Sequence, residues 1–164
     1  MISLSKVAKE LHHHIRVNKG FRSDLLWWSC FLPTWNGVSM MSSASHRYEA
    51  TITSDASGRW GCGAFSSEGE WFQLEWPDSW SGLHIAIKEL LPIVVAMAVW
   101  GKKWRGKRVR CRCDNAAVVA MLSSGSSKDE RAMHLLRSLF LFLATYDVSI
   151  VGEHIRGIEN GPAD

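Results

Sequence analysis

The chain has 164 residues, of which 46% are hydrophobic, and its formal net charge is only +3. This composition suits one compact domain with an ordinary core plus an appendage, and it excludes a long disordered protein. No apolar run approaches the ~18 residues of a membrane span, and the N-terminus lacks the apolar centre of a signal peptide. We therefore expect no membrane partner.

The first 47 residues are predicted to form helices and a polar linker without a core of their own. Apolar residues recur at helical spacing from Leu4 to Val17, and Ser23-Asp24 can cap a second helix that ends at Pro33. A segment of this kind has to dock on another surface. The expected division is therefore a helical connection and linker over 1–47 and a domain over 48–164.

From residue 48 onward, the pattern predicts five strands and three helices. The strands are expected at 50–55, 60–65, 70–76, 109–113 and 148–154, and the helices at 84–103, 115–122 and 130–146. The first three strands are joined by short turns, which give antiparallel pairing, whereas helical crossovers give parallel pairing. The fold class is thus α/β, a mixed five-stranded sheet with helices on its faces. Pro92 lies inside the long helix and should either kink it or remove one backbone hydrogen bond.

The four cysteines show no C-x-x-C spacing, and they are Cys30, Cys62, Cys111 and Cys113. We expect reduced, packed thiols rather than zinc ligands or disulfides, and hence an intracellular protein, either cytoplasmic or nuclear. Cys111 and Cys113 alternate along a strand, so they should share one face.

Four carboxylates stand where a two-metal site would need them. Asp55 and Asp114 each end a strand, Glu89 lies in the long helix, and Asp164 closes the chain. If the first and fourth strands are neighbours, Asp55 and Asp114 lie side by side and Glu89 faces them. Mutual repulsion of grouped carboxylates is offset by divalent cations, and all-oxygen ligands suit Mg²⁺ or Mn²⁺. Two such ions ~3.5–4 Å apart support hydrolysis of a phosphodiester.

Each acid alone also has a purely structural interpretation. Asp55 can belong to a turn, Asp114 can cap the next helix, Glu89 can lie on a helix surface, and Asp164 can be an unstructured terminus. The joint order of all four is what favours a metal site.

A basic run between residues 102 and 112 contains seven cations and no acid. They are Lys102, Lys103, Arg105, Lys107, Arg108, Arg110 and Arg112. Such a local field suits a nucleic-acid backbone, although a helix C-terminus also favours cations through its dipole.

Four motifs follow one another from residue 54 to residue 164. They are S-D-A-S-G-R-W-G-C-G-A, K-E-L-L-P-I-V-V-A, C-D-N-A-A-V-V and H-I-R-G-I-E-N-G-P-A-D. In this order they resemble the ribonuclease H domain of retroelement reverse transcriptases, most of all the DIRS-type and gypsy-type versions. The segment 24–37 resembles the connection between polymerase and ribonuclease H in DIRS-type elements.

This resemblance implies a metal-dependent endonuclease that cleaves the RNA strand of RNA–DNA hybrids. It implies two Mg²⁺ or Mn²⁺ ions and the polymerase portion of the same polyprotein as a partner, with the oligomeric state left open. The implied catalytic residues and metal ligands are Asp55, Glu89, Asp114 and Asp164. The chain stops at Asp164, so the helix that carries this acid in the family is missing.

The resemblance also suggests accessory and substrate-binding residues. A hybrid backbone would be gripped by Lys102, Lys103, Arg105, Lys107 and Arg108. Asn115 and Trp60 are candidates for contacts to the RNA strand, against helix capping for Asn115 and core packing for Trp60. His154 could assist proton transfer or product release, against a plain histidine at a strand end.

Two other functions compete with this hypothesis. The first is a catalytically inactive ribonuclease H-like relic that binds nucleic acid or braces a polymerase, which would keep the basic run without needing the acids. The second is a transposase or integrase of the same fold. Those enzymes usually carry two Asp and a Glu on a late helix, and the early position of Glu89 argues against them.

Overall fold

The chain divides into two compact units, Met1–Thr34 and Trp35–Asp164. The computed structural model describes residues 17–35 and 48–157. Most of the first expected helix, the expected boundary between 47 and 48, and Asp164 lie outside the described residues.

The first unit is built on α1, which spans Lys19–Phe31 and runs into a 3-10 turn, η2, at Leu32–Thr34. Asn18 caps α1, because its side-chain oxygen accepts a hydrogen bond from the N–H of Phe21 at 2.9 Å. The predicted cap at Ser23 was therefore wrong. Ser23 lies inside the helix, where its hydroxyl donates to the carbonyl of Lys19.

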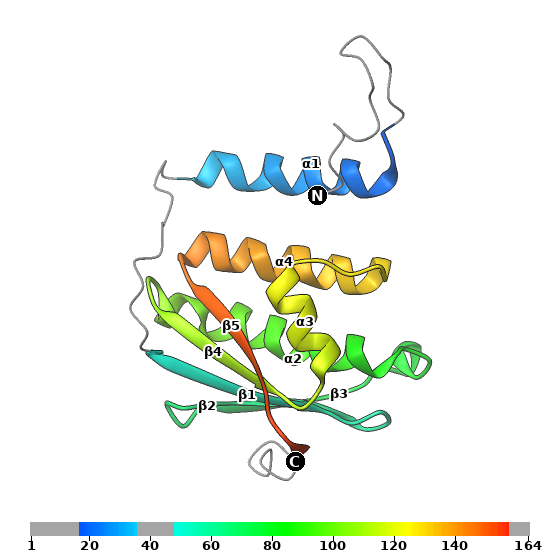
Figure 1. Cartoon of the computed structure of the whole chain (residues 1–164), viewed down its shortest axis with the longest axis vertical. Helices are drawn as coiled ribbons and strands as arrows, with labels where there is room; N and C mark the ends of the chain where they lie inside the picture. Colours follow the sequence, from blue (N-terminus) through cyan, green and yellow to red (C-terminus); the bar gives the residue numbers. More distant parts are fainter. Residues whose placement is uncertain (1–16, 36–47, 158–164) are drawn as a thin grey trace. The chain divides into compact units, whose positions relative to one another are not determined.

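The second unit contains a five-stranded sheet in the order β3-β2-β1-β4-β5 (Figure 1). Its strands are β1 (Ala50–Ala56), β2 (Gly61–Ser66), β3 (Trp71–Glu75), β4 (Arg108–Cys113) and β5 (Ser149–His154). β2 pairs antiparallel with both β1 and β3, whereas β4 pairs parallel with both β1 and β5. The predicted mixed sheet, with an antiparallel part followed by a parallel part, is confirmed.

Three helices accompany this sheet, α2 (Ile85–Trp100), α3 (Ala116–Ser124) and α4 (Glu130–Tyr146). α2 packs against β1 and β2, α3 packs against β5, and α4 packs on α2 (Figure 1). Two 3-10 turns, η3 (Asp78–Trp80) and η4 (Gly101–Trp104), flank α2. None of the helices in the described ranges is long and apolar enough to cross a membrane.

The side chains of the sheet separate into an inner face toward the helices and an outer face. In β1 the even-numbered residues from Ala50 to Ala56 are buried, and the odd-numbered ones are half-exposed. β4 follows the same rule and buries Val109, Cys111 and Cys113. Burial of apolar surface between the inner face and α2 is thus the main source of stability in this unit.

The cysteines are free thiols, as predicted, and Cys62, Cys111 and Cys113 are buried. Cys30 is exposed, so the expectation of packing was wrong for that residue. It lies on α1, which buries none of its residues.

α2 runs through Pro92 without interruption. Because proline has no N–H, the carbonyl of Lys88, four residues earlier, lacks its usual partner within the helix. The first turn of α2 therefore depends more on contacts outside the helix.

Candidate metal centre and nucleic-acid groove

The carboxyl ends of β1 and β4 bring two predicted site residues to one edge of the sheet. The parallel register pairs Thr53 with Arg112. Continued by two residues, it brings Asp55 level with Asp114, which follows directly after β4. The expected adjacency of these two acids therefore follows from the observed pairing.

Glu89 reaches the same edge from α2. The helix begins after His84, whose ring Nδ1 accepts a hydrogen bond from the N–H of Ala86 at 3.2 Å. Glu89 lies in the second turn and is only 5% exposed. Its Oε2 accepts a hydrogen bond from the thiol of Cys113, with a sulfur-to-oxygen distance of 3.7 Å.

The three carboxylates act on one another electrostatically. Burial, and then the negative charges of Asp55 and Asp114, together raise the pKa of Glu89 from 4.5 to about 8, against a lowering by the hydrogen bond from the thiol of Cys113. A buried carboxylate beside two others is costly to ionise unless a cation compensates it. The electrostatics of this edge therefore fit a divalent cation.

The tightest group of possible metal ligands consists of Glu89, Cys113 and Asp114. Their ligand atoms all lie within 4.8 Å of one another. Asp55 is not in this closest group, although it acts on Glu89 through its charge. The structure thus brings three of the four predicted acids to one edge, and the fourth, Asp164, lies outside the described residues.

The loop between β1 and β2 is held from several sides. The hydroxyl of Ser57 accepts hydrogen bonds from the N–H groups of Arg59 and Trp60, at 3.2 and 3.1 Å. The indole of Trp76 donates to the carbonyl of Ser57 at 2.7 Å, and Lys88 Nζ donates to the carbonyl of Gly58 at 2.5 Å. The backbone next to Asp55 is consequently well anchored.

Trp60 projects from this loop into solvent, so of its two interpretations the one of core packing was wrong. The side chain is 72% exposed, and the guanidinium of Arg59 lies 5.0 Å from its ring centre. The hydrogen bonds that hold the loop involve its backbone, and the indole of Trp60 lies outside the core.

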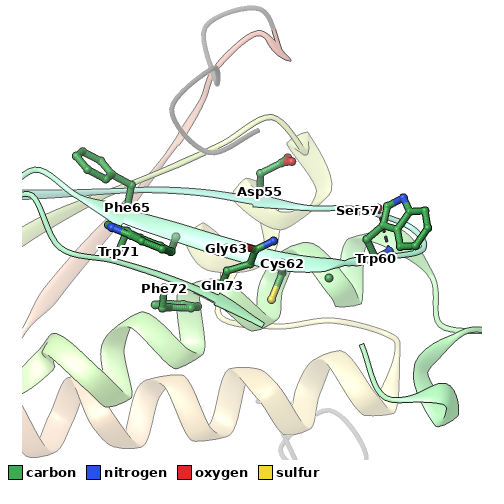
Figure 2. A pocket seen from close by; sticks show the side chains of 11 residues that line it. Asp55, Ser57, Trp60, Cys62, Gly63, Phe65, Trp71, Phe72 and Gln73 are labelled. Atoms are coloured by element: carbon green, nitrogen blue, oxygen red, sulfur yellow. Dashed lines mark hydrogen bonds between the residues drawn. The ribbon is translucent and has the colours of Figure 1, made fainter. Parts of the chain in front are cut away.

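A groove of about 640 Å³ runs along the outer face of β2 beside Asp55 (Figure 2). Trp60 stands at one end, and Phe65 and Trp71 stand at the other (Figure 2). Its floor includes Gly63, which pairs directly with Asp55 across the two strands. Since Gly63 has no side chain, the space beside the carboxylate stays open.

The first part of the predicted basic run, from Lys102 to Arg108, lies toward the opposite end of β4 from Asp114, whereas Arg110 and Arg112 lie along the strand. With a rise of about 3.3 Å per residue, the length of β4 separates the two ends by roughly 17 Å. Acids from other elements also face this run. Lys103 pairs with Glu70, and Lys107 lies 3.5 Å from Glu68, both from the hairpin between β2 and β3.

Further along β4, the cations are paired as well. Arg110 and Arg112 both pair with Glu153, at 3.2 and 3.4 Å. The guanidinium groups of Arg108 and Arg110 lie over the ring of Tyr48. Lys102 and Arg105 are exposed. The positive field is therefore weaker than the local sequence suggests.

Asn115 and His154 lie next to Asp114. The Asn115 side chain accepts a hydrogen bond from the N–H of Ala117 at 3.0 Å and so caps α3, which confirms the capping interpretation. His154 ends β5, and its Nε2 lies 2.9 Å from the carbonyl oxygen of Asp114. Both residues border the acidic edge, and their roles in binding or catalysis stay predictions.

Comparisons with known proteins show which fold the chain has. No protein-family model and no curated protein matches the chain. The N-terminal RNase H domain of rv2228c from Mycobacterium tuberculosis matches with a TM-score of 0.56 and 14% identity, over 70% of this chain and 87% of that one. LC11-RNase H1, solved in complex with an RNA/DNA hybrid, matches with a TM-score of 0.57 and 15% identity, over 70% and 89%. The chain therefore has a ribonuclease H-like fold.

Two residues at this edge were missed by sequence reasoning. For Cys113 the sequence predicts a packed thiol, but not the contact of its sulfur with Glu89. For Gly63 the sequence predicts only a place in the strand expected at 60–65, yet this residue pairs with Asp55. The alternation of Cys111 and Cys113, with Asp114 directly after them, was the available signal, because it puts the thiol on the inner face next to a metal-ligand candidate.

Proposed function

We propose that the chain is a metal-dependent endonuclease that cleaves the RNA strand of RNA–DNA hybrids. The observation that supports it most is the meeting of Asp55, Glu89 and Asp114 at the carboxyl ends of two parallel strands. This arrangement occurs on a fold shared with a protein that was solved with an RNA/DNA hybrid.

The proposed ligands of two Mg²⁺ or Mn²⁺ ions are Asp55, Glu89 and Asp114, with Asp164 as the fourth. Such ions, when bound, supply the positive charge that activates a water and stabilises the leaving oxygen of a phosphodiester. The protein contributes by holding the ligand side chains in place. Glu89 is held by its burial on α2, and the anchored loop after Asp55 limits the movement of that carboxylate.

The groove beside Asp55 is the proposed path of the nucleic acid. Open space over Gly63 lets a strand approach the carboxylate, and the exposed rings of Trp60 and Trp71 offer stacking surfaces for bases. The basic run and Asn115 are proposed to contact the phosphate backbone away from this groove, and His154 is proposed as an accessory residue.

The test is cleavage of a hybrid whose RNA strand carries a label, in the presence of Mg²⁺. We expect RNA fragments from the hybrid, with the DNA strand intact. Asp55→Asn should lower the rate at least ~100-fold, because a metal ligand is lost. Asp78→Asn changes an exposed acid in η3 and serves as the matched control. Unchanged cleavage by Asp55→Asn would refute the proposal.

The motif order further supports a place in the reverse transcriptase of a DIRS-type or gypsy-type retroelement. In that setting the polymerase portion of the same polyprotein is the partner, the segment 1–47 is the connection to it, and the protein is intracellular. A polymerase Y-x-D-D motif in the genomic DNA upstream is the expected finding.

An inactive relic that only binds nucleic acid is the second candidate. The pairing of Lys103 and Lys107 with acids weakens the basic run on which that function would depend. Tight binding of the hybrid without cleavage, in both Mg²⁺ and Mn²⁺, would favour this candidate.

A further inference from the structure

The thiol of Cys113 belongs to the hydrophobic core and also contacts a carboxylate of the acidic edge. Cys113 is the last residue of β4 and is 0% exposed. Its sulfur lies 3.7 Å from Oε2 of Glu89 and accepts a hydrogen bond from the N–H of Asn115 at 3.4 Å. These contacts fix the sulfur beside two carboxylates.

The distance between Cys113 Sγ and Glu89 Oε2 matches that of two ligands in a tetrahedral metal site with one sulfur ligand. Zinc binds sulfur at about 2.3 Å and carboxylate oxygen at about 2.1 Å, so two such ligands lie about 3.6 Å apart at the tetrahedral angle. The observed distance between Cys113 Sγ and Glu89 Oε2 is 3.7 Å. Asp114 supplies a third ligand atom within 4.8 Å of the other two.

The burial of Glu89 without a cationic partner among the described residues provides a second observation. The side chain is 5% exposed, and no salt bridge found within residues 17–35 and 48–157 includes it. The neighbouring cation, Lys88, forms no salt bridge with Glu89 in this part of the structure, and its Nζ donates instead to the carbonyl of Gly58. A buried carboxylate without a cationic side chain points to a cation from solution.

We propose that Glu89, Cys113 and Asp114 bind a thiophilic divalent cation, such as Zn²⁺, in competition with Mg²⁺. On binding, the S–H bond of Cys113 breaks, its proton passes to solvent, and the sulfur electron pair binds the cation. Oxygen-only sites favour Mg²⁺, whereas a thiolate ligand favours softer ions. The inference rests on the proposed role of Glu89 and Asp114 as metal ligands, but it requires no hydrolysis.

The consequence is an enzyme whose metal centre is blocked by trace zinc. A cation held by sulfur at Glu89 and Asp114 occupies ligands that Mg²⁺ needs. The site would thus respond to the ratio of free zinc to free magnesium.

Cobalt is a suitable probe, because Co²⁺ bound to thiolate absorbs light in a charge-transfer band. We would titrate the full chain with Co²⁺, without nucleic acid, in a Cys30→Ser background that removes the exposed thiol. One equivalent of Co²⁺ should produce the band, excess Zn²⁺ should abolish it, and Cys113→Ala should lack it.

Cys111→Ala is the matched control, since Cys111 lies on the same strand and face with the same 0% exposure but outside the ligand group. It should keep the band. Circular dichroism would verify that both variants fold. Should Cys113→Ala fail to fold, Glu89→Gln takes its place, and it should weaken Co²⁺ binding at least tenfold.

A band retained in Cys113→Ala, no band in the parent chain, or unchanged Co²⁺ affinity in Glu89→Gln would each overturn the inference. The test is separate from that of the nuclease. A cobalt band without any hybrid cleavage would reject the nuclease and keep the thiophilic site. Cleavage without a band would do the reverse.

Discussion

Replacing Glu89 by glutamine should make the folded protein less sensitive to alkaline pH when no metal is present. In the wild type, the raised pKa means that the folded state holds a proton on Glu89 that the unfolded state releases between pH 4.5 and about 8. Stability is therefore lost as pH rises through this window, because the unfolded state binds fewer protons there. Glutamine does not titrate, so the variant lacks this loss.

The size of the effect follows from the two pKa values. A change from 4.5 to about 8 corresponds to about 5 kcal/mol over the full window, at 1.36 kcal/mol for each pH unit. Between pH 5 and pH 8 the expected part is about 3.5 kcal/mol, since the unfolded group is already partly ionised at pH 5. The stability of Glu89→Gln relative to wild type should improve by this amount across that interval.

Urea unfolding at pH 5 and pH 8 in the presence of a chelator measures this difference. Taking the difference between variant and wild type cancels the titration of all other groups. Glu75→Gln, an exposed acid on β3, is the control and should show no such trend. If the stability difference for Glu89→Gln stays constant between the two pH values, the electrostatic account of the site is wrong. Added Mg²⁺ should restore stability to the wild type at pH 8 and have little effect on the variant.

Four further changes test the groove and the loop beside it. Gly61→Ala should cost roughly 3 kcal/mol in urea unfolding, because the new Cβ would lie 2.0 Å from the carbonyl oxygen of Leu74. Gly58→Ala, with nothing within 4 Å, should stay within about 0.5 kcal/mol of wild type. Lys88→Met leaves the carbonyl of Gly58 without its donor, so it should cost about 1–3 kcal/mol and speed hydrogen exchange in the loop. Trp60→Ala should leave stability unchanged and weaken binding of the hybrid by roughly tenfold, measured by fluorescence anisotropy, through loss of a stacking surface. Equal hybrid affinity in that variant would remove Trp60 from the substrate path.

Local pattern predicted the sheet well because its strands are short and separated by clear turns. The parallel pairing of β1 with β4 followed from the helical crossover between them, and it placed Asp55 next to Asp114. The predicted strands and helices of the second unit differ from the observed ones only at their first and last residues. The cap of α1 moved to Asn18, since several polar residues near its start compete for the same role.

The features that the sequence did not predict depend on contacts between distant parts of the chain, and a local sequence pattern carries no information about such contacts. The pairing of Lys107 with Glu68 requires the β2–β3 hairpin to lie beside the start of β4. The exposure of Trp60 depends on which groups of the β1–β2 loop are anchored from β3 and α2. The contact of Cys113 with Glu89 depends on the rotation of α2 about its own axis.

The parallel pairing of β1 with β4 also has a consequence for biosynthesis. Asp55 leaves the ribosome about sixty residues before Asp114, and the loop between them has to close before the two strands can pair. Until β4 has been made, a nascent chain holds only the antiparallel β1–β2–β3 part and α2. An assembled centre would thus appear only after β4 has emerged and paired with β1.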